Sequence, residues 1–169
     1  MRSREVSDLL MLGMGAYTPL DGFMGHDDWR GAAEDMKLSS GLFWPIPITL
    51  AAEPDIADGI SEGEEVALVD AETGEIGAVM EVREKYAYDK ELECSHVYRT
   101  TDTGHPGVAK VMQQGEVGLA GPVTALTEGH YPETYEGLYH RPAEIRAMFQ
   151  ANGWSRVAAF QTRNPMHGS

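Results

Sequence analysis

The sequence predicts a β-rich mixed α/β domain over residues 1–130, followed by the first helix and strand of a second, α/β domain. The 169 residues include 19 glycines and 9 prolines, and this frequency of chain-breaking residues favours short strands joined by turns over a helical bundle. From residue 131 the pattern changes to one helix followed by one apolar strand, the order in which α/β domains are built. A chain of this length can hold one domain with a sizeable core and part of another.

The first third of the chain is predicted to contain two helices and a strand. Ser3 can cap a helix over residues 4–12, in which apolar side chains recur on one face. Residues 27–36 have the same periodicity and predict a second helix. Residues 42–50 are apolar and predict a strand, placed partly at a sheet edge because its two prolines cannot donate ladder hydrogen bonds. A turn-rich loop precedes the second helix, and its apolar residues are expected in the core: Tyr17, Leu20 and Phe23.

The middle of the chain carries a hairpin signal. The apolar runs 66–69 and 76–82 flank an acidic turn in which Gly74 can supply the positive φ that a hairpin needs. Residues 85–92 are rich in charge and are expected to be exposed. The glutamates near the hairpin predict a solvated face rather than paired acid–base catalysis: Glu62, Glu64, Glu65, Glu72 and Glu75.

A short helix and two short strands are predicted next. The helix covers residues 108–113 and follows the turn His105-Pro106-Gly107. The strands cover residues 117–120 and 123–126. For the turn, a capped helix start is the preferred interpretation, and the wall of an active-site cleft is the alternative.

The C-terminal part begins with a polar, aromatic link over residues 131–141. Pro142 suits the first position of a helix that runs to Asn152, and Gly153 is a typical stop. The helix packing face is predicted to contain Ala143, Ala147, Met148 and Phe149. The apolar run that starts at Val157 and ends at Gln161 predicts a buried strand, followed by a loop of ligand-type residues.

Charge and cysteine content narrow the function classes. The formal net charge is −14, and an acidic surface repels phosphate backbones, so we expect no nucleic-acid partner. The single cysteine, Cys94, excludes an internal disulfide and fits a reducing cytoplasm. No apolar stretch is long enough to span a bilayer, so no membrane association is expected. The histidines do not have metal-ligand spacing, and we expect no metal site built by the protein.

Four motifs carry a resemblance to a known family. They are GAYTPLDGFM at residues 15–24, FWPIPI at 43–48, GHPGV at 104–108 and AFQTRNPMH at 159–167. Their types and order are similar to those of ATP sulfurylase (sulfate adenylyltransferase), over essentially the whole chain. The resemblance implies a PUA-like β-barrel domain over residues 1–130 that lacks its earliest residues, a linker over 131–141, and the beginning of a truncated Rossmann-like nucleotidyltransferase domain over 142–169.

The resemblance also implies a reaction and its substrates. The family joins sulfate to the α-phosphate of ATP and releases pyrophosphate, giving adenylyl sulfate. Sulfate is a weak nucleophile, so catalysis must come from in-line positioning and neutralisation of phosphate charge. Magnesium would arrive as MgATP and be held by phosphate oxygens and water rather than by a protein site. The expected partners are ATP, sulfate, adenylyl sulfate and pyrophosphate, with a homo-oligomer as a further possibility.

The candidate site residues follow the predicted last strand. A planar guanidinium suits a tetrahedral oxyanion, which points to Arg163. By resemblance, Gln161 and Arg163 hold sulfate, and Thr162, Arg163 and Asn164 form the catalytic strand end. The nucleotide phosphates would be contacted by these four residues together with His167, which matches the first histidine of the family's His-x-x-His pair.

The sequence departs from the family pattern directly after this histidine. Gly168 and Ser169 stand where the family has an arginine, a small residue and then the second histidine. We therefore expect this chain alone to be inactive or nearly so. Two alternatives stay open: a stand-alone PUA-like binding module, against which the charge of −14 argues, and an oligomerisation domain without activity.

Overall fold

The computed structural model describes residues 1–161. The helices are α1 (Ser3–Gly13), α2 (His26–Asp35), α3 (Pro54–Asp58), α4 (Lys90–Val97), α5 (Pro106–Met112), α6 (Tyr131–Thr134) and α7 (Pro142–Ala151). The strands are β1 (Gly22–Phe23), β2 (Ala51–Ala52), β3 (Glu65–Val69), β4 (Ile76–Glu81), β5 (Glu84–Ala87) and β6 (Val117–Ala125). Within this range no helix is both long enough and apolar enough to cross a membrane.

Strand β6 organises the sheet. Its C-terminal half pairs with β1 and β4, and its N-terminal half pairs with β2 and β5, all antiparallel. The hairpin β3–β4 extends the sheet, giving the order β1-β6-β4-β3. Across residues 1–161 no strand pair closes this sheet into a barrel. The β-rich mixed α/β prediction is confirmed, and the expected barrel is present as an open antiparallel sheet.

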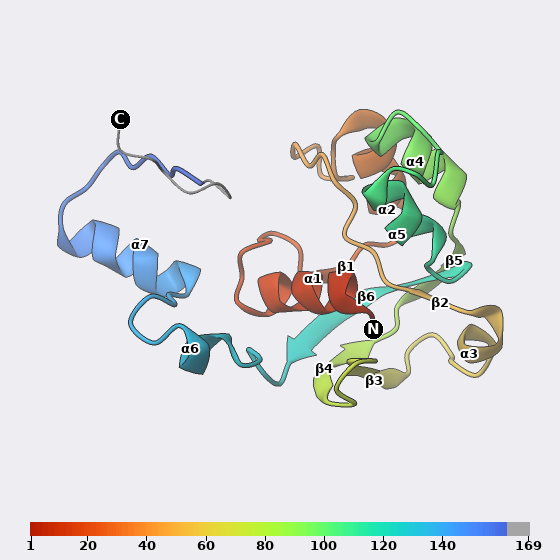
Figure 1. Cartoon of the computed structure of the whole chain (residues 1–169), viewed down its shortest axis with the longest axis horizontal. Helices are drawn as coiled ribbons and strands as arrows, with labels where there is room; N and C mark the ends of the chain where they lie inside the picture. The colour runs from red at the N-terminus through yellow and green to blue at the C-terminus, as the bar shows by residue number, and fades with distance from the viewer. Residues whose placement is uncertain (162–169) are drawn as a thin grey trace.

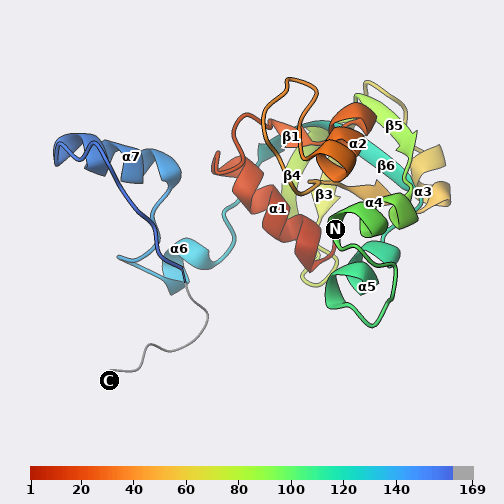
Figure 2. The same ribbon diagram turned by 90° about the horizontal axis from the view of Figure 1, so that it is seen from above.

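The core lies where helices cover this sheet. Helix α1 packs against β6 and β4, while α2 contacts α4, and α4 contacts α5. Figures 1 and 2 show α2, α4 and α5 gathered at one end of the domain, with α1 lying along the sheet. The fully buried large side chains include Trp29, Leu9, Met80, Val82, Val108 and Val111.

Several predicted elements are confirmed within one or two residues at each end. These are the first two helices (α1 and α2), the hairpin β3–β4, the short helix α5 and the helix α7. The glutamates of the hairpin region are exposed, as expected. The apolar residues of the turn-rich loop are also in the core as predicted: Phe23 is buried, and Tyr17 and Leu20 are partly buried and pack against it.

The strand predicted over residues 42–50 is wrong. This segment is irregular and holds one isolated bridge, between Lys37 and Phe43. Its end is nevertheless buried at Ile48 and Leu50, which explains its apolar character. Pro45 and Pro47 lack the amide hydrogens that a ladder requires, and pairing is confined to the two residues of β2.

Two further predictions need correction. The two strands predicted over residues 117–120 and 123–126 are one continuous strand, β6, because Gly121 and Pro122 between them also pair, with the short edge strand β1. Gly121 adopts a φ of 154° there, which few side chains tolerate. The region 85–92 is not simply exposed, because it contains β5 and the start of α4. There the alternate residues Tyr86 and Tyr88 point inward and are buried.

The C-terminal helices are set apart from the rest of the described chain. In both views α6 and α7 stand away from the sheet and its helices (Figures 1 and 2). Helix α7 has no buried residue. The predicted packing face is therefore wrong within the described structure: Ala143 and Ala147 are exposed, and Met148 is 41 % exposed. The predicted link also contains the short helix α6, which was not predicted from the sequence.

Candidate functional site

The candidate site begins at Gln161, the last described residue. It is exposed and lies in irregular chain that follows α7. The other candidates, Thr162, Arg163, Asn164 and His167, lie outside the described residues. The roles assigned to all five by resemblance therefore stay predictions.

Helix α7 leads the chain toward this site, and its start is fixed by local sequence. Pro142 occupies the first turn, where a missing amide hydrogen costs nothing. The Arg141 amide donates to Glu144 Oε2 at 2.8 Å, which closes a capping box. Arg141 also donates from Nη1 to Glu144 Oε1 at 3.0 Å. One arginine thus serves both as the N-cap and as an ion-pair partner of the first turn.

The end of α7 is as predicted. Gly153 adopts a positive φ of 67°, and the Trp154 amide reaches back to the Phe149 carbonyl at 3.0 Å. The Asn152 side chain donates to the Met148 carbonyl at 2.8 Å, which satisfies another carbonyl of the last turn. The chain therefore leaves the helix in a defined direction toward Gln161.

The buried strand predicted over Val157 to Gln161 is wrong in this structure. No strand is assigned there, and Val157 and Phe160 are 51 % and 81 % exposed. A strand needs a neighbour that satisfies its amides and carbonyls. Within residues 1–161 no strand lies beside this segment to do so. The apolar character that suggested burial is real, but the described chain does not cover it.

The turn His105-Pro106-Gly107 is a capped helix start. His105 is the N-cap of α5, and its Nδ1 accepts from the amides of Gly107 and Val108 at 3.2 and 3.4 Å. The ring also lies 5.1 Å from that of Tyr98. The preferred structural interpretation is therefore confirmed, and the imidazole is occupied by the helix it caps.

Sequence reasoning missed a buried polar cluster between α1, α4 and the sheet. The Glu93 carboxylate, 1 % exposed, accepts from Trp29 Nε1 at 2.8 Å and from Tyr88 Oη at 2.7 Å. Tyr88 Oη also lies 2.9 Å from Gln114 Oε1. Gln114 Nε2 continues the chain of bonds to Glu5 Oε1 at 2.9 Å. Elements distant in sequence are thereby joined through one hydrogen-bonded network.

Arg4 and Asp8 extend this cluster toward the surface. Arg4 Nη2 lies 3.7 Å from Glu93 Oε1, and Arg4 Nε lies 3.9 Å from Asp8 Oδ2. Burial raises the pKa of Asp8 to about 6, although the positive charge of Arg4 and the hydrogen bond from Tyr17 oppose this effect. Burial and the charge of Glu93 raise the pKa of Tyr88, which keeps its phenol protonated.

A signal for this cluster was present in the sequence. Glu5 and Asp8 share the helical spacing of Leu9 and Leu12, so all four project from one face of α1. That face is the buried one, whereas the prediction of this helix rested on its recurring apolar side chains and gave the two acidic ones no role. The members of the cluster are hydrogen-bonded to one another, and their arrangement joins helices to the sheet.

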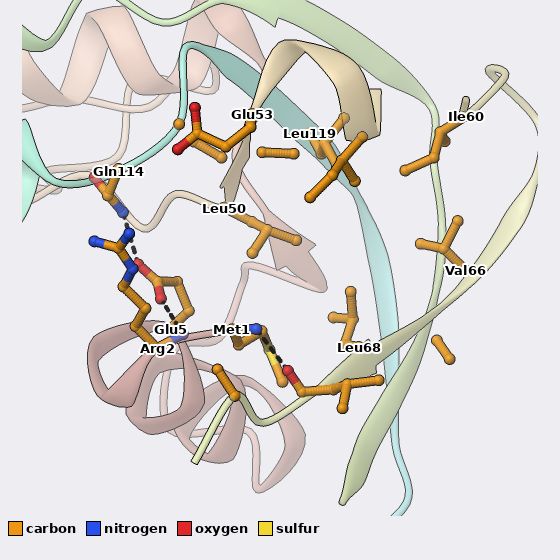
Figure 3. A pocket seen from close by; sticks show the side chains of 17 residues that line it. Met1, Arg2, Glu5, Leu50, Glu53, Ile60, Val66, Leu68, Gln114 and Leu119 are labelled. Carbon is orange, nitrogen blue, oxygen red and sulfur yellow. Dashed lines mark hydrogen bonds between the residues drawn. The ribbon is translucent and has the colours of Figure 1, made fainter. Parts of the chain in front are cut away.

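A hollow lies beside this cluster (Figure 3). Its volume is about 510 Å³, and the side chains of Leu50, Leu68 and Leu119 form much of its wall. Glu5 and Gln114 lie at one edge, already bonded to each other. Gln161, the candidate residue that the structure describes, does not line it. Among residues 1–161 no group of His, Cys, Asp and Glu side chains is arranged to hold a metal ion.

The chain is similar in sequence to known proteins. Residues 1–128 match the family model described as a PUA-like domain, and residues 136–169 match the model described as ATP-sulfurylase. The whole chain is 57 % identical to a sulfate adenylyltransferase of Chlorobium chlorochromatii and 58 % identical to one of Syntrophobacter fumaroxidans. In both cases the chain spans 42 % of the relative's length.

A solved structure is similar over nearly the same range. It is titled "Hexameric APS kinase from Thiobacillus denitrificans", and it is 31 % identical with a TM-score of 0.68. The match covers 97 % of this chain and 28 % of that one. The fold described above is thus found within a longer polypeptide.

Proposed function

Because the chain belongs to the ATP sulfurylase (sulfate adenylyltransferase) family, of which it carries the PUA-like domain and the start of the catalytic domain, we propose that it is part of an enzyme that makes adenylyl sulfate. The reaction is attack of a sulfate oxygen on the α-phosphate of ATP, with pyrophosphate as the leaving group. The observation that carries this proposal is the match of residues 136–169 to the family's catalytic domain, which includes every candidate site residue.

The proposed chemistry follows from the residue types at the site. Sulfate offers little nucleophilic power, so the enzyme must align it with the α-phosphate and neutralise the charge that builds up there. The Arg163 guanidinium, assisted by Gln161, would hold the tetrahedral anion through paired hydrogen bonds. Thr162, Asn164 and His167 would donate to the phosphates of MgATP, which enters as the substrate.

We further propose that this chain alone does not catalyse the reaction. It spans 42 % of the length of its curated relatives, and Gln161 is exposed at the end of the described structure. The remaining groups would come from the part of the relatives that the chain does not span. Cytoplasmic location belongs to the same proposal and is supported by the single, buried thiol of Cys94.

Self-association is also part of the proposal. The apolar side chains that α7 and its following segment leave exposed include Trp154 at 55 % and Phe160 at 81 %. Exposed apolar surface of this kind favours association. The similar structure from Thiobacillus denitrificans is titled hexameric. Light scattering coupled to size-exclusion chromatography would give the mass in solution, and a monomer at all concentrations would contradict this part.

A chimera tests the central proposal. This chain would be joined to the segment of the Chlorobium chlorochromatii relative that follows the matched region. The reverse reaction would then be measured with adenylyl sulfate, pyrophosphate and magnesium, and ATP would be detected by luminescence. We expect ATP from the chimera, none from the chain alone, and a loss of at least about 100-fold in the Arg163→Ala chimera, the usual scale for removing a transition-state charge partner.

The matched control is Arg156→Gln, which removes an exposed arginine that precedes the site and should leave the rate unchanged. A folded but inactive chimera would contradict the proposed function. ATP formation by the chain alone would contradict only the expectation that it is inactive. Mass-resolved oligomers without ATP or sulfate binding would favour an oligomerisation module instead.

A further inference from the structure

We propose that Glu128 and Arg141 form a clamp that sets the direction of α7 relative to the sheet domain, which makes Arg141 a positioning residue for the chain that begins at Gln161. The clamp itself is argued from contacts alone. Its importance for catalysis rests on the proposed function, because α7 leads directly to the candidate site.

The clamp is a two-point contact. Arg141 Nε donates to Glu128 Oε1 at 2.6 Å, and Arg141 Nη2 donates to Glu128 Oε2 at 2.5 Å. Two parallel bonds between a planar guanidinium and a carboxylate fix an orientation, which a single point contact cannot do. The Tyr139 ring lies under the same guanidinium, 5.9 Å from its carbon. The Arg141 guanidinium therefore contacts three side chains: Glu128, Tyr139 and Glu144.

The two partners belong to different parts of the molecule. Glu128 follows β6, the strand that pairs with four others and so belongs to the rigid sheet. Arg141 is the N-cap of α7 and is bound to the first turn through Glu144. A bond between Glu128 and Arg141 thus connects the end of the sheet directly to the start of the helix. The intervening residues, which include α6, form a loop that the clamp closes.

Few contacts other than the clamp connect α7 to the sheet domain. Helix α7 has no buried residue, and in Figures 1 and 2 it stands away from the sheet domain. Within the described chain, the side-chain hydrogen bonds and ion pairs that join residues 131–161 to residues before 130 all reach Glu128: those of Arg141, and that of the Tyr139 hydroxyl beside the same carboxylate. The direction of α7 is therefore determined at the clamp rather than by packing along the helix.

The clamp should control orientation more than folding stability. Both side chains are partly exposed, at 45 % for Arg141 and 31 % for Glu128, and exposed ion pairs contribute little to stability. The same exposure makes the pair sensitive to salt, because mobile ions screen it. Removing it would leave the sheet domain folded and α7 free to adopt several directions.

A distance measurement tests the clamp without relying on activity. Spin labels would be placed at Ser7→Cys on α1 and Gln150→Cys on α7, both exposed positions, and pulsed electron spin resonance would give the distance distribution. Cys94 is buried, and a protein without the two new cysteines measures any labelling there. We expect a narrow distribution, at least about twofold broader in Glu128→Gln and in about 0.5 M salt.

Two matched variants separate the clamp from other roles of the same charges. Glu144→Gln removes the ion pair of Arg141 inside the helix but leaves Glu128 in place, and Arg146→Gln removes another charge of α7. Both should keep the narrow distribution. Arg141→Lys keeps the charge but loses the fork, so its distribution should broaden as in Glu128→Gln.

The outcomes are distinct. A broad distribution in the unmodified chain, an unchanged one in Glu128→Gln, or equal broadening in all variants would overturn the clamp. Broadening in Glu128→Gln and Arg141→Lys alone would support it. An inactive chimera would count against the proposed function and would leave this distance result unaffected, so the two failures can be told apart.

Discussion

Tyr88 and Glu93 share a short hydrogen bond inside the domain, 2.7 Å between the phenol oxygen and Glu93 Oε2. Tyr88 follows β5 and Glu93 lies in α4, so the bond fastens the helix to the end of the strand. Trp29 of α2 donates to the same carboxylate oxygen at 2.8 Å. A carboxylate that is 1 % exposed must have such donors, because a buried charge without partners is costly.

Replacing Tyr88 with phenylalanine should destabilise the domain. The ring would remain, but its one hydroxyl proton would be lost, and Glu93 would keep only Trp29 as a neutral donor. Leaving buried acceptors unsatisfied costs about 1–3 kcal/mol. Urea denaturation followed by circular dichroism measures the change. Tyr135→Phe, at a position 50 % exposed, is the control and should be neutral; equal stability of the two variants would contradict the role assigned to Tyr88.

Asp8 should make the stability of the domain dependent on pH. Its pKa is raised by burial to about 6 from 3.8, so the folded state holds the proton more tightly than the unfolded state. The stabilisation by this group is complete below pH 3.8 and is lost as the pH rises through about 6. The groups facing it are Arg4, Tyr17, Glu5 and Glu93.

The substitution Asp8→Asn isolates this contribution because asparagine does not titrate. We expect the wild type to lose stability relative to Asp8→Asn between pH 4 and pH 8, by on the order of 2–3 kcal/mol. Parallel urea titrations across this range measure the difference. Asp27→Asn, at a side chain 92 % exposed, is the control. A constant difference between wild type and Asp8→Asn at every pH would refute the raised pKa.

We expect that no side chain larger than hydrogen fits at Gly22, where β1 pairs with β6. A Cβ there would overlap the backbone oxygen of Gly121, which cannot move without breaking the pairing of these strands. We expect Gly22→Ala to cost more than about 2 kcal/mol, the scale of overpacking in a close-packed site. Gly59→Ala is the matched control, since φ there is −77° and the nearest atom would be 3.4 Å away. Thermal unfolding of both variants tests this, and similar melting temperatures would contradict it.

The sequence was most informative where one local rule decided the structure. Gly74 in the hairpin turn, Pro142 at the start of α7 and Gly153 at its end each act through backbone geometry. Prediction failed where distant partners decide. Residues 42–50 were apolar because they cover the core, and their prolines prevented pairing. The last apolar run needs a neighbouring strand that residues 1–161 do not offer.

The candidate site shows the same division. Gln161 and the residues after it were recognisable from a motif, yet their roles depend on groups brought together by folding. The buried cluster around Glu93 joins Glu5 to Gln114 across most of the chain. No local sequence pattern predicts a contact between residues so far apart in the chain. The alternating positions of Tyr86 and Tyr88 are typical of a strand with one buried face, and both side chains are buried. The charged residues Lys85 and Lys90 beside them nevertheless led to the prediction of an exposed segment.

Acid should release the clamp only well below neutral pH. The hydrogen bond from Arg141 lowers the pKa of Glu128, and the Arg141 amide, followed by its guanidinium, lowers that of Glu144. A carboxylate with a lowered pKa keeps its pairing above the ordinary glutamate value of about 4.3 and loses it as the pH falls through the lower one. The distance distribution between α1 and α7 should therefore stay narrow from pH 7 to about 4.3 and broaden only below.

The variant Glu128→Gln supplies the comparison for this titration. It should already be broad at pH 7 and should not change further on acidification, because the titrating partner is gone. Near-ultraviolet circular dichroism at each pH separates release of the clamp from unfolding of the sheet domain. Broadening of the wild-type distribution between pH 7 and pH 5, with the domain still folded, would mean that a group other than Glu128 holds α7, since this carboxylate remains ionised throughout that range.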